Sequence, residues 1–360
     1  VIIVRRMRVL HLFGDWKWTG PSEPTLDLCI ELRALGVDVA LACMAAPDDA
    51  QGGLPHRARE RGLEPLHDAS LKRTVLSTLR DTKTVARMCR GYDLIHTHFS
   101  HDHVVGGRAA RKAGGVKIVR TNHKAIPTPF NVATKYLYRK LTDGYITASR
   151  MALEKDVTRF GLRGWQIDPA MRLDRFAPRP APHEGFRVGV VARMQRHRRF
   201  DILLQGIKLA RVADLQVQIV GRGTHMDEVA VQPARRLGLS NVQFTGYLGD
   251  RYLDTLAGFD ALLFLVPGSD GTCRAIREAM CMGKAVIGAR RGMIPEIVDD
   301  GTTGLVIDDS PENIARAIER LAADRAACAR MGQAGREKAL RLYDVKRQAR
   351  AVKDIYAQLL

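Results

Sequence analysis

The segment from Asp260 to Gly288 constrains the fold of this chain more than any other. It opens with an apolar run over 260–266, passes through a turn of small residues into a helical stretch that ends at Gly283, and closes with a second apolar run over 285–288. Short apolar runs on either side of a helix are typical of buried parallel strands. The segment therefore predicts a βαβ unit, with any ligand site at the carboxyl end of its first strand.

Two carboxylates bracket the turn of this unit. A helix that starts near Thr272 or Cys273 points free backbone N–H groups and its positive dipole end at an anion such as a diphosphate. At about 1.5 Å of rise per residue, Glu278 lies about a ribose away and can accept both ribose hydroxyls. Asp270, before the first turn, would face what lies beyond the phosphates. The alternative is that Asp270 only caps the helix and Glu278 is an exposed helix acid.

The same segment resembles the C-terminal signature of the retaining glycosyltransferases of the GT-B fold, family 4, also called glycosyl transferases group 1. The matching positions are Glu278-Ala279-Met280, Gly283, Pro295-Glu296-Ile297-Val298, Asp300-Gly301 and Gly304. Asp270 stands where the family has Glu, and Thr272-Cys273 where it has Phe-Gly. A shorter Asp reaches a donor sugar less far, and Cys273 lacks the close backbone approach of glycine. The resemblance implies donor contacts from Gly271 and Arg274 as well.

The length of 360 residues exceeds one ordinary core, and the 46% apolar content suffices for two. Strand and helix patterns alternate, which predicts an α/β class. A proline-rich stretch, 176–185, marks a boundary. With the resemblance, we expect two Rossmann-like domains with an interdomain cleft. These are an acceptor-binding domain at 1–178, a nucleotide-sugar-binding domain at 179–342, and a C-terminal crossover helix at 343–360 that packs on the first domain.

The first domain begins with a strand over 8–13, a turn that contains Gly20, and a helix. A strand, a glycine turn and a helix make a phosphate-facing corner, although such a glycine by itself only permits a turn. In the family a G-G-x-E turn here lies under the diphosphate of the donor, which implies that Gly20 contacts the donor and Glu23 faces the acceptor. Pro21 replaces the second glycine of that pattern.

A group of histidines follows in the same domain. His96 and His98 share one face of a strand, and His101, Asp102 and His103 lie just beyond, which is one pattern for a metal site. The D-x-x-H-x-H pattern of the family accounts for the same residues without metal, and places His98 on the wall of the acceptor cleft.

His123 follows the next predicted strand, 116–120, and lies at its carboxyl end, where α/β sites form. It is either a histidine hydrogen-bonded beneath a loop or, by resemblance, the catalytic histidine that contacts the donor sugar.

In the second domain we predict a first strand over 186–191, and the loop after it is basic. Arg193 and Asp201 match the family pattern R-x4-K-G-x-D, while Arg198 stands for Lys and Arg199 for Gly. In that pattern the two cations neutralise the diphosphate, and guanidinium groups bind phosphate oxygens bidentately. A basic loop can otherwise be a merely solvated face.

Two further turns, at Gly221 and at Tyr247-Leu248, correspond to loops that flank the nucleobase in related enzymes, although Tyr247 could also pack locally. No D-x-D carboxylate pair follows a strand, so we expect neither a metal nor any cofactor beyond the donor. Arg193, Arg198 and the helix N-terminus would then stabilise the leaving group, and Asp270 would position sugar hydroxyls.

The net charge of +18 implies an acidic partner. Basic residues concentrate in 71–90 and 108–150, and 130–140 mixes aromatic residues with cations, which suits an anionic membrane surface. Plain solvation is the alternative, and no recognised nucleic-acid-binding module accompanies the charge. We expect a glycan or lipid-linked acceptor and an envelope role in lipopolysaccharide, exopolysaccharide or glycolipid synthesis.

The six cysteines are scattered, and no apolar run reaches the roughly 20 residues that span a bilayer. We therefore expect a cytoplasmic protein, peripheral on the inner face of the plasma membrane. Residues 1–6 read as a translated leader outside the fold.

Two other functions fit the sequence. One is a sugar-nucleotide epimerase of the same fold, which needs no acceptor. The other is a catalytically weakened member that binds a nucleotide sugar, which the departures at Asp270, Thr272-Cys273 and 169–172 suggest.

Overall fold

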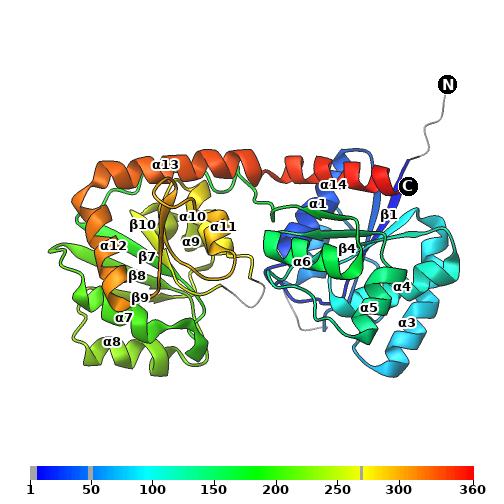
Figure 1. Cartoon of the computed structure of the whole chain (residues 1–360), viewed down its shortest axis with the longest axis horizontal. Coiled ribbons are helices and arrows are strands. Elements are labelled where there is room, and N and C mark those ends of the chain that lie inside the picture. The colour runs from blue at the N-terminus through cyan, green and yellow to red at the C-terminus, as the bar shows by residue number, and fades with distance from the viewer. Residues whose placement is uncertain (1–5, 48–51, 268–270) are drawn as a thin grey trace. The chain divides into compact units, whose positions relative to one another are not determined.

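The protein folds into two compact units (Figure 1). The computed structural model describes residues 6–47, 52–267 and 271–360. Unit 1 comprises residues 1–170 together with 345–360, and unit 2 comprises residues 171–344. Each unit contains one six-stranded sheet in which every strand pair is parallel.

Unit 1 has the strand order β2-β1-β3-β4-β5-β6. Its strands are β1 (Arg8–Phe13), β2 (Asp38–Cys43), β3 (Leu94–Thr97), β4 (Lys117–Asn122), β5 (Gly144–Thr147) and β6 (Gly164–Gln166). Its helices are α1 (Ser22–Ala34), α2 (Leu54–Glu60), α3 (Val75–Met88), α4 (Ser100–Ala113), α5 (Val132–Lys140), α6 (Arg150–Phe160) and α14 (Val345–Leu359), with a short 3₁₀ turn, η1 (Cys89–Gly91).

Alternation along β1 divides the core of unit 1 into two layers. Val9 and Phe13 pack with residues of α1 and α14 on one face of the sheet, and Leu10 and Leu12 pack with α3 and α4 on the other. His11 has the parity of Val9 and Phe13, so it lies beneath α14 although it is polar. It is fully buried.

Unit 2 has the strand order β12-β11-β10-β7-β8-β9. Its strands are β7 (Phe186–Val191), β8 (Leu215–Val220), β9 (Val242–Gly246), β10 (Ala261–Phe264), β11 (Ala285–Ala289) and β12 (Gly304–Ile307). Its helices are α7 (Phe200–Leu209), α8 (Gln232–Arg236), α9 (Tyr252–Ala257), α10 (Arg274–Cys281), α11 (Ile294–Ile297), α12 (Pro311–Ala323) and α13 (Arg325–Leu342), with short turns η2 (Arg196–Arg198), η3 (Asp227–Val231) and η4 (Gly249–Arg251).

The βαβ unit that the sequence predicts is present as β10, α10 and β11, and the two strands pair in parallel. The first strand is shorter than the apolar run: β10 ends at Phe264, and Leu265 is buried beyond it. Helix α10 begins at Arg274, and Gly283 follows its end with a φ of +69°, which favours glycine. The prediction of two α/β domains is confirmed, and β10, the strand before α10, lies inside its sheet.

The boundary between the units differs from the proline-rich stretch that the sequence suggested. Unit 2 begins at Met171, not after residue 178. Met171 N–H donates to the Tyr343 carbonyl, and Arg336 of α13 donates to the Phe176 carbonyl. Residues 171–178 therefore bond to the last helical segment of unit 2, and the prolines that follow lie within that unit. At the other end the change comes after Asp344, and α14 packs on α1.

Among the described residues, no helix combines the length and the apolar character that a bilayer crossing requires.

Candidate functional site

The loop after β7 carries the two arginines that the sequence selects. Arg193 is exposed and has no carboxylate partner among the described residues. Arg198 is half-buried, and its Nη1 donates to the Val266 carbonyl at 2.7 Å. Since Val266 follows β10, this bond joins the loops at the carboxyl ends of two neighbouring strands. Arg198 thus lies against the βαβ turn, while Arg193 remains open to solvent.

The loop after β8 packs closely on the same region. Gly221 has a φ of +130°, and a Cβ there would lie 2.2 Å from the Ala192 carbonyl oxygen. At Gly223 a Cβ would lie 2.0 Å from the Met194 carbonyl oxygen. Both positions therefore require glycine, because a side chain would push the β7 and β8 loops apart.

Glu278 is 7% exposed, in α10, and both of its carboxylate oxygens are engaged. Arg274, one turn earlier, donates its Nε proton to Oε1 at 2.7 Å, and the Tyr252 hydroxyl donates to Oε2 at 2.5 Å. Burial, and next the charge of Glu278, raise the pKa of Tyr252 well above its usual value, so the phenol stays protonated and can donate. The interpretation of Glu278 as an exposed helix acid is therefore wrong.

The turn before α10 adopts an uncommon backbone conformation. Cys273 has φ 50° and ψ 44°, in the left-handed region that non-glycine residues rarely occupy. Arg277, 1% exposed, reaches back from α10 to the Thr272 carbonyl and lies over the Tyr343 ring at 5.0 Å. Gly271 precedes them with φ +70°. Asp270 lies outside the described residues.

The two nucleobase candidates follow β9. Tyr247 is exposed, and the guanidinium of Arg222, from the β8 loop, lies 5.1 Å from its ring centroid. Leu248 is half-buried beside it. The arginine stacks on one side of the phenol, which leaves an aromatic surface in the neighbourhood of the other carboxyl-end loops.

In unit 1, Gly20 is exposed and does not adopt a positive φ, so its backbone conformation does not demand glycine. Glu23, in the first turn of α1, is 6% exposed and lies 3.8 Å from Arg61, which also pairs with Asp27 at 2.5 Å. The structure therefore gives Glu23 a structural partner within unit 1.

The four histidines at the carboxyl end of this sheet form a connected group. His11 Nδ1 lies 3.0 Å from His98 Nε2, and His98 Nδ1 lies 3.0 Å from His123 Nε2. His96 stacks on His98 at a centroid distance of 4.5 Å. The Tyr356 hydroxyl of α14 contacts His96 Nδ1 at 2.5 Å and His11 Nε2 at 3.3 Å. His123 is hydrogen-bonded, as one of its two sequence interpretations expects, and its contact with a donor sugar stays a prediction.

Burial keeps all four imidazoles neutral. It lowers the pKa of His11 and of His123 to about 3, with a further contribution from the Arg120 cation at His123, and it lowers the pKa of His96 and His98 well below the usual value. Asp102, nearby in α4, shows the opposite effect, because desolvation raises its pKa to about 7.

His11, His96 and His98 are close enough to be considered as metal ligands, since their nitrogens lie within 4.8 Å of one another. Both nitrogens of His96 already have partners, Tyr356 and the Thr121 hydroxyl at 2.6 Å. The rings of His96 and His98 stack at 24°, whereas ligand rings converge on one point. The geometry fits a hydrogen-bonded chain better than a metal centre.

Sequence reasoning missed three residues of these groups: His11, Tyr252 and Tyr356. A histidine with inward parity in an apolar strand was the available signal for His11. Nothing in the sequence pairs Tyr252 with Glu278 or Tyr356 with His96, since each pair is far apart along the chain.

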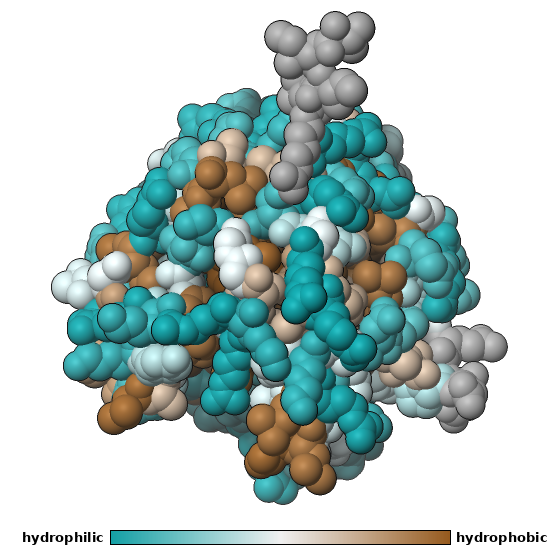
Figure 2. Space-filling model, turned by 90° about the vertical axis from the view of Figure 1, so that its right-hand side faces the viewer, coloured by the Kyte–Doolittle hydropathy of each residue, from teal (hydrophilic) through white to brown (hydrophobic). Residues whose placement is uncertain are grey.

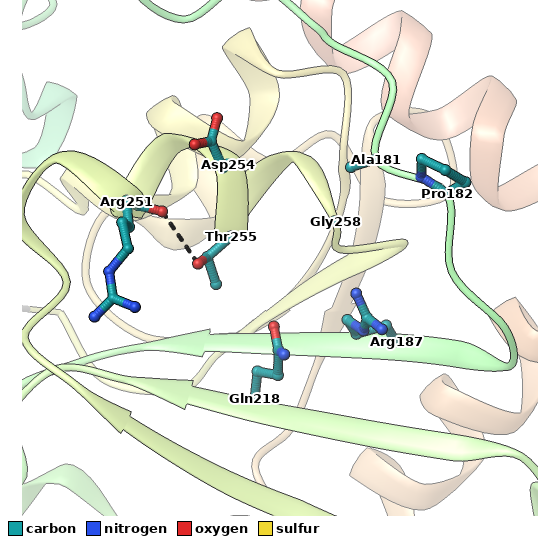
Figure 3. Close-up of a pocket in the computed structure, with 8 residues that line it drawn as sticks. All are labelled: Ala181, Pro182, Arg187, Gln218, Arg251, Asp254, Thr255 and Gly258. Carbon is teal, nitrogen blue, oxygen red and sulfur yellow. Dashed lines mark hydrogen bonds between the residues drawn. The ribbon is translucent and has the colours of Figure 1, made fainter.

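A pocket elsewhere in unit 2 lies away from these loops (Figure 3). Arg187, near the start of β7, and Gln218 of β8 face the Thr255 and Gly258 region of α9 across it. Because Arg187 is at the amino end of its strand, the pocket is not at the carboxyl ends where ligands of such sheets bind.

Comparison with known proteins identifies the two domains. Residues 172–338 match the family model described as "Glycosyl transferases group 1", and residues 20–168 match "Glycosyltransferase Family 4". The fold matches the Anabaena protein HepE in complex with UDP and glucose, with a TM-score of 0.80, 19% identity, and coverage of 98% of this chain and 100% of that one. The class is therefore a two-domain glycosyltransferase of the GT-B fold, composed of a family 4 domain and a group 1 domain.

Two curated relatives are mannosyltransferases. A GDP-mannose-dependent alpha-(1-6)-phosphatidylinositol monomannoside mannosyltransferase of Mycolicibacterium smegmatis is 29% identical over 65% of this chain and 68% of its own length. A GDP-mannose-dependent alpha-mannosyltransferase of Corynebacterium glutamicum is 32% identical over 37% of this chain and 30% of its own length. The chain thus matches about two thirds of one relative and under a third of the other.

Proposed function

We propose that the protein transfers a sugar, with retention, from a UDP- or GDP-sugar to an acceptor hydroxyl. The observation that carries this proposal is Glu278, a buried carboxylate held at the carboxyl end of β10 within a group 1 domain. Its partner Arg274 lies one turn closer to the helix N-terminus. A ribose hydroxyl pair can take the place of the Arg274 bond, which frees that guanidinium for phosphate.

In the transfer, the bond from the sugar to the diphosphate breaks and a bond to the acceptor oxygen forms. In this proposal Arg193, Arg198 and the N-terminus of α10 offset the negative charge that the leaving diphosphate gains, so no metal is needed. His123 and Asp270 act on the sugar, and Gly20 and the Gly271–Cys273 turn approach the diphosphate. Tyr247 and Leu248 contact the base, and Glu23 serves the acceptor side. His98, which is 1% exposed and has both nitrogens bonded, acts only through His123.

A donor-binding experiment tests this assignment. We expect one of UDP-, GDP- and ADP-sugars to raise the melting temperature. At a concentration of 100 times its Kd, that donor should raise the free energy of unfolding by about 2.7 kcal/mol. Glu278→Gln keeps the side-chain volume and should abolish that shift, and Arg193→Ala should weaken it. Glu312→Gln, an exposed acid on α12 of the same unit, is the matched control. An unchanged shift in Glu278→Gln contradicts the donor site.

Turnover assays test metal dependence and retention, and they distinguish a transferase from an epimerase or a binding protein. Transfer that persists in EDTA, with an unchanged anomeric configuration in the product's NMR spectrum, is the expected result. Sugar conversion without an acceptor would instead indicate an epimerase. A donor-dependent shift without transfer or hydrolysis would indicate a binding protein.

We also propose that the acceptor is a glycan or a lipid-linked sugar of the cell envelope, met at an anionic membrane surface. The support is an exposed surface on unit 1 that combines apolar and cationic side chains. Leu76 of α3 is 81% exposed and Val132 of α5 is 87% exposed, and both helices carry exposed cations such as Arg80 and Lys135. Figure 2 shows apolar groups set among hydrophilic side chains on the face that it presents. Such surfaces suit anionic lipid better than neutral lipid.

Liposome flotation tests the membrane proposal. The protein should float with anionic vesicles and not with neutral ones, and high salt should release it. Val132→Asp should weaken flotation, while Leu209→Asp, at an exposed apolar position of unit 2, should not. Equal flotation with both vesicle types would contradict an electrostatic surface.

A further inference from the structure

A chain of hydrogen bonds runs from the C-terminal helix to His123. It starts at the Tyr356 hydroxyl, continues through His11 and His98, and ends at His123 Nε2, with contacts of 3.3, 3.0 and 3.0 Å. Tyr356, His11 and His98 are at most 1% exposed. His123 is only partly buried, so it is the member of the chain that a ligand can reach.

Because these rings are neutral, the position of the proton on one ring determines its position on the next. A neutral imidazole has one N–H donor and one bare acceptor nitrogen. His11 and His98 each use both nitrogens within the chain, so a proton on one side of a ring leaves a lone pair on the other side. The direction of the first hydrogen bond therefore determines the direction of all the others, and with it which nitrogen of His123 carries the proton.

Tyr356 determines that direction because it has one proton and two nitrogen neighbours. A hydroxyl donor makes shorter hydrogen bonds than an N–H donor. The contact to His96 Nδ1 is 2.5 Å and the contact to His11 Nε2 is 3.3 Å, so the hydroxyl donates to His96 and accepts from His11. His96 then carries its proton on Nε2 and donates it to the Thr121 hydroxyl. The direction comes from Tyr356, where one hydroxyl has two imidazole contacts of unequal length, and not from the 2.6 Å length of the Thr121 contact, which a hydroxyl donor would also fit.

The rest of the chain follows. His11 Nδ1 is bare and accepts from His98 Nε2–H. His98 Nδ1 is then bare and accepts from His123 Nε2–H, with the Thr25 hydroxyl 3.4 Å away as a second donor to the same nitrogen. His123 Nδ1 has no hydrogen-bond partner among the described residues.

We propose that Tyr356, through His11 and His98, holds His123 in the tautomer with the proton on Nε2, so that Nδ1 accepts a hydrogen bond from a hydroxyl of the bound sugar. This inference rests on the proposed function, in which His123 faces the donor sugar. Tyr356, His11 and His98 are positioning residues, since they act on the sugar only through His123. A group in α14, distant in sequence, thereby determines whether His123 accepts or donates.

The tautomer can be measured without turnover. In long-range ¹H–¹⁵N spectra of the full chain, protonated and bare imidazole nitrogens resonate far apart, and His123→Gln identifies the His123 signals. We expect a single Nε2–H tautomer for His123 in the wild-type protein. Tyr356→Phe removes only the hydroxyl and should give a mixture of tautomers at His123. Tyr138→Phe removes a buried hydroxyl outside the chain, bonded to Thr128, and should leave the spectrum unchanged.

Kinetics should show the same dependence. Tyr356→Phe should lower kcat by about two- to tenfold, the range of one neutral hydrogen bond, with KM for the nucleotide sugar nearly unchanged because other residues hold the nucleotide. Tyr138→Phe should leave both parameters as in the wild type.

Three results would overturn the inference. They are an Nδ1–H tautomer of His123 in the wild-type protein, a Tyr356→Phe spectrum with the His123 tautomer intact, and stoichiometric bound metal that disappears in His11→Gln. Failure of the proposed function is distinguishable, because it would appear as wild-type protein without donor-dependent transfer, whereas the wild-type spectrum tests the chain by itself.

Discussion

The polar groups at the carboxyl end of the sheet are neutral in unit 1 and charged in unit 2. In unit 1 four imidazoles are neutral and bonded to one another and to a phenol. In unit 2 the buried carboxylate of Glu278 is paired with the Arg274 guanidinium, and Arg193 is an exposed cation. The difference arises because imidazole can shed its charge when it is desolvated, whereas guanidinium remains protonated and needs an anion or water.

This contrast has a consequence for chemistry. Neutral imidazoles can pass hydrogen-bond direction along a chain, since each ring is both donor and acceptor. Charged pairs can instead exchange one partner for a ligand of the same sign, as a diphosphate for a carboxylate. The first arrangement suits recognition of sugar hydroxyls and the second suits binding of a nucleoside diphosphate.

The largest expected effect on this contrast comes from acid, which protonates the buried histidines and destabilises unit 1. The pKa of His11 and of His123 is about 3 in the folded state, below the unfolded value of about 6.5, so the unfolded chain binds more protons and stability falls as pH drops below about 6.5. Each such histidine contributes about 1.4 kcal/mol per pH unit in this range. Asp102, raised to about 7, opposes them, because its native form takes up a proton first as pH falls.

The net loss for unit 1 between pH 7 and pH 5 should be on the order of 7 kcal/mol, since His103, which is also buried with its pKa well below the usual value, adds to the four histidines, and Asp102 opposes them. The three tryptophans are Trp16, Trp18 and Trp165, so tryptophan fluorescence in urea reports on unit 1. The urea midpoint should drop sharply at pH 5. A midpoint that stays constant would mean that the imidazoles are not buried as neutral groups.

Removing the carboxylate of Glu278 should have the next largest effect, in unit 2. Glu278→Leu removes the ion pair with Arg274 and the acceptor of the Tyr252 hydroxyl, and the expected loss is about 2 kcal/mol. This is less than the roughly 3–5 kcal/mol of a fully buried pair, because Arg274 is 31% exposed. Urea unfolding followed by far-UV circular dichroism measures it.

The control for Glu278→Leu is Glu228→Leu, which removes the exposed partner of Arg196 and should change the midpoint little. The double change Arg274→Met with Glu278→Leu should recover part of the loss. Equal effects of Glu278→Leu and Glu228→Leu would mean that the Glu278 pair is solvated.

The smallest effect concerns Cys273. Its left-handed backbone should make Cys273→Gly more stable than Cys273→Ala by about 1 kcal/mol, although glycine is the smaller residue. Cys281, in the last turn of α10, is the matched control, and there the glycine variant should be the less stable of the two. The same order of stability at both positions would show that Cys273 is not strained.

The structure also explains two departures from the family pattern. Cys273 and Arg199 stand where the family has glycine, and both adopt left-handed backbone conformations, with φ of 50° and 56°. Each is the residue before the first turn of a helix. The backbone geometry is therefore kept with a residue that fits it less well, and Arg199 gains an ion pair with Asp309 at 3.2 Å.

Local patterns were enough to predict most of the fold. The runs at 8–13 and 186–191 became strands with those bounds, and the turn at Gly221 has the close approach that only glycine allows. The strand ending near His123 was predicted too short, since β4 continues to Asn122. These features depend on a few neighbouring residues, so the periodicity of apolar residues and the residue types in turns predict them.

The two α/β units, the βαβ turn and the choice of Glu278 and His123 as candidate residues follow from the sequence alone, because each depends on side chains close together in the chain. Which groups are charged, and which atom donates in each hydrogen bond, depends instead on the folded unit. Burial and partners set a pKa, and they come from distant segments: Tyr356 reaches His11 and His96 from the far end of the chain, and Tyr252 reaches Glu278 from another helix.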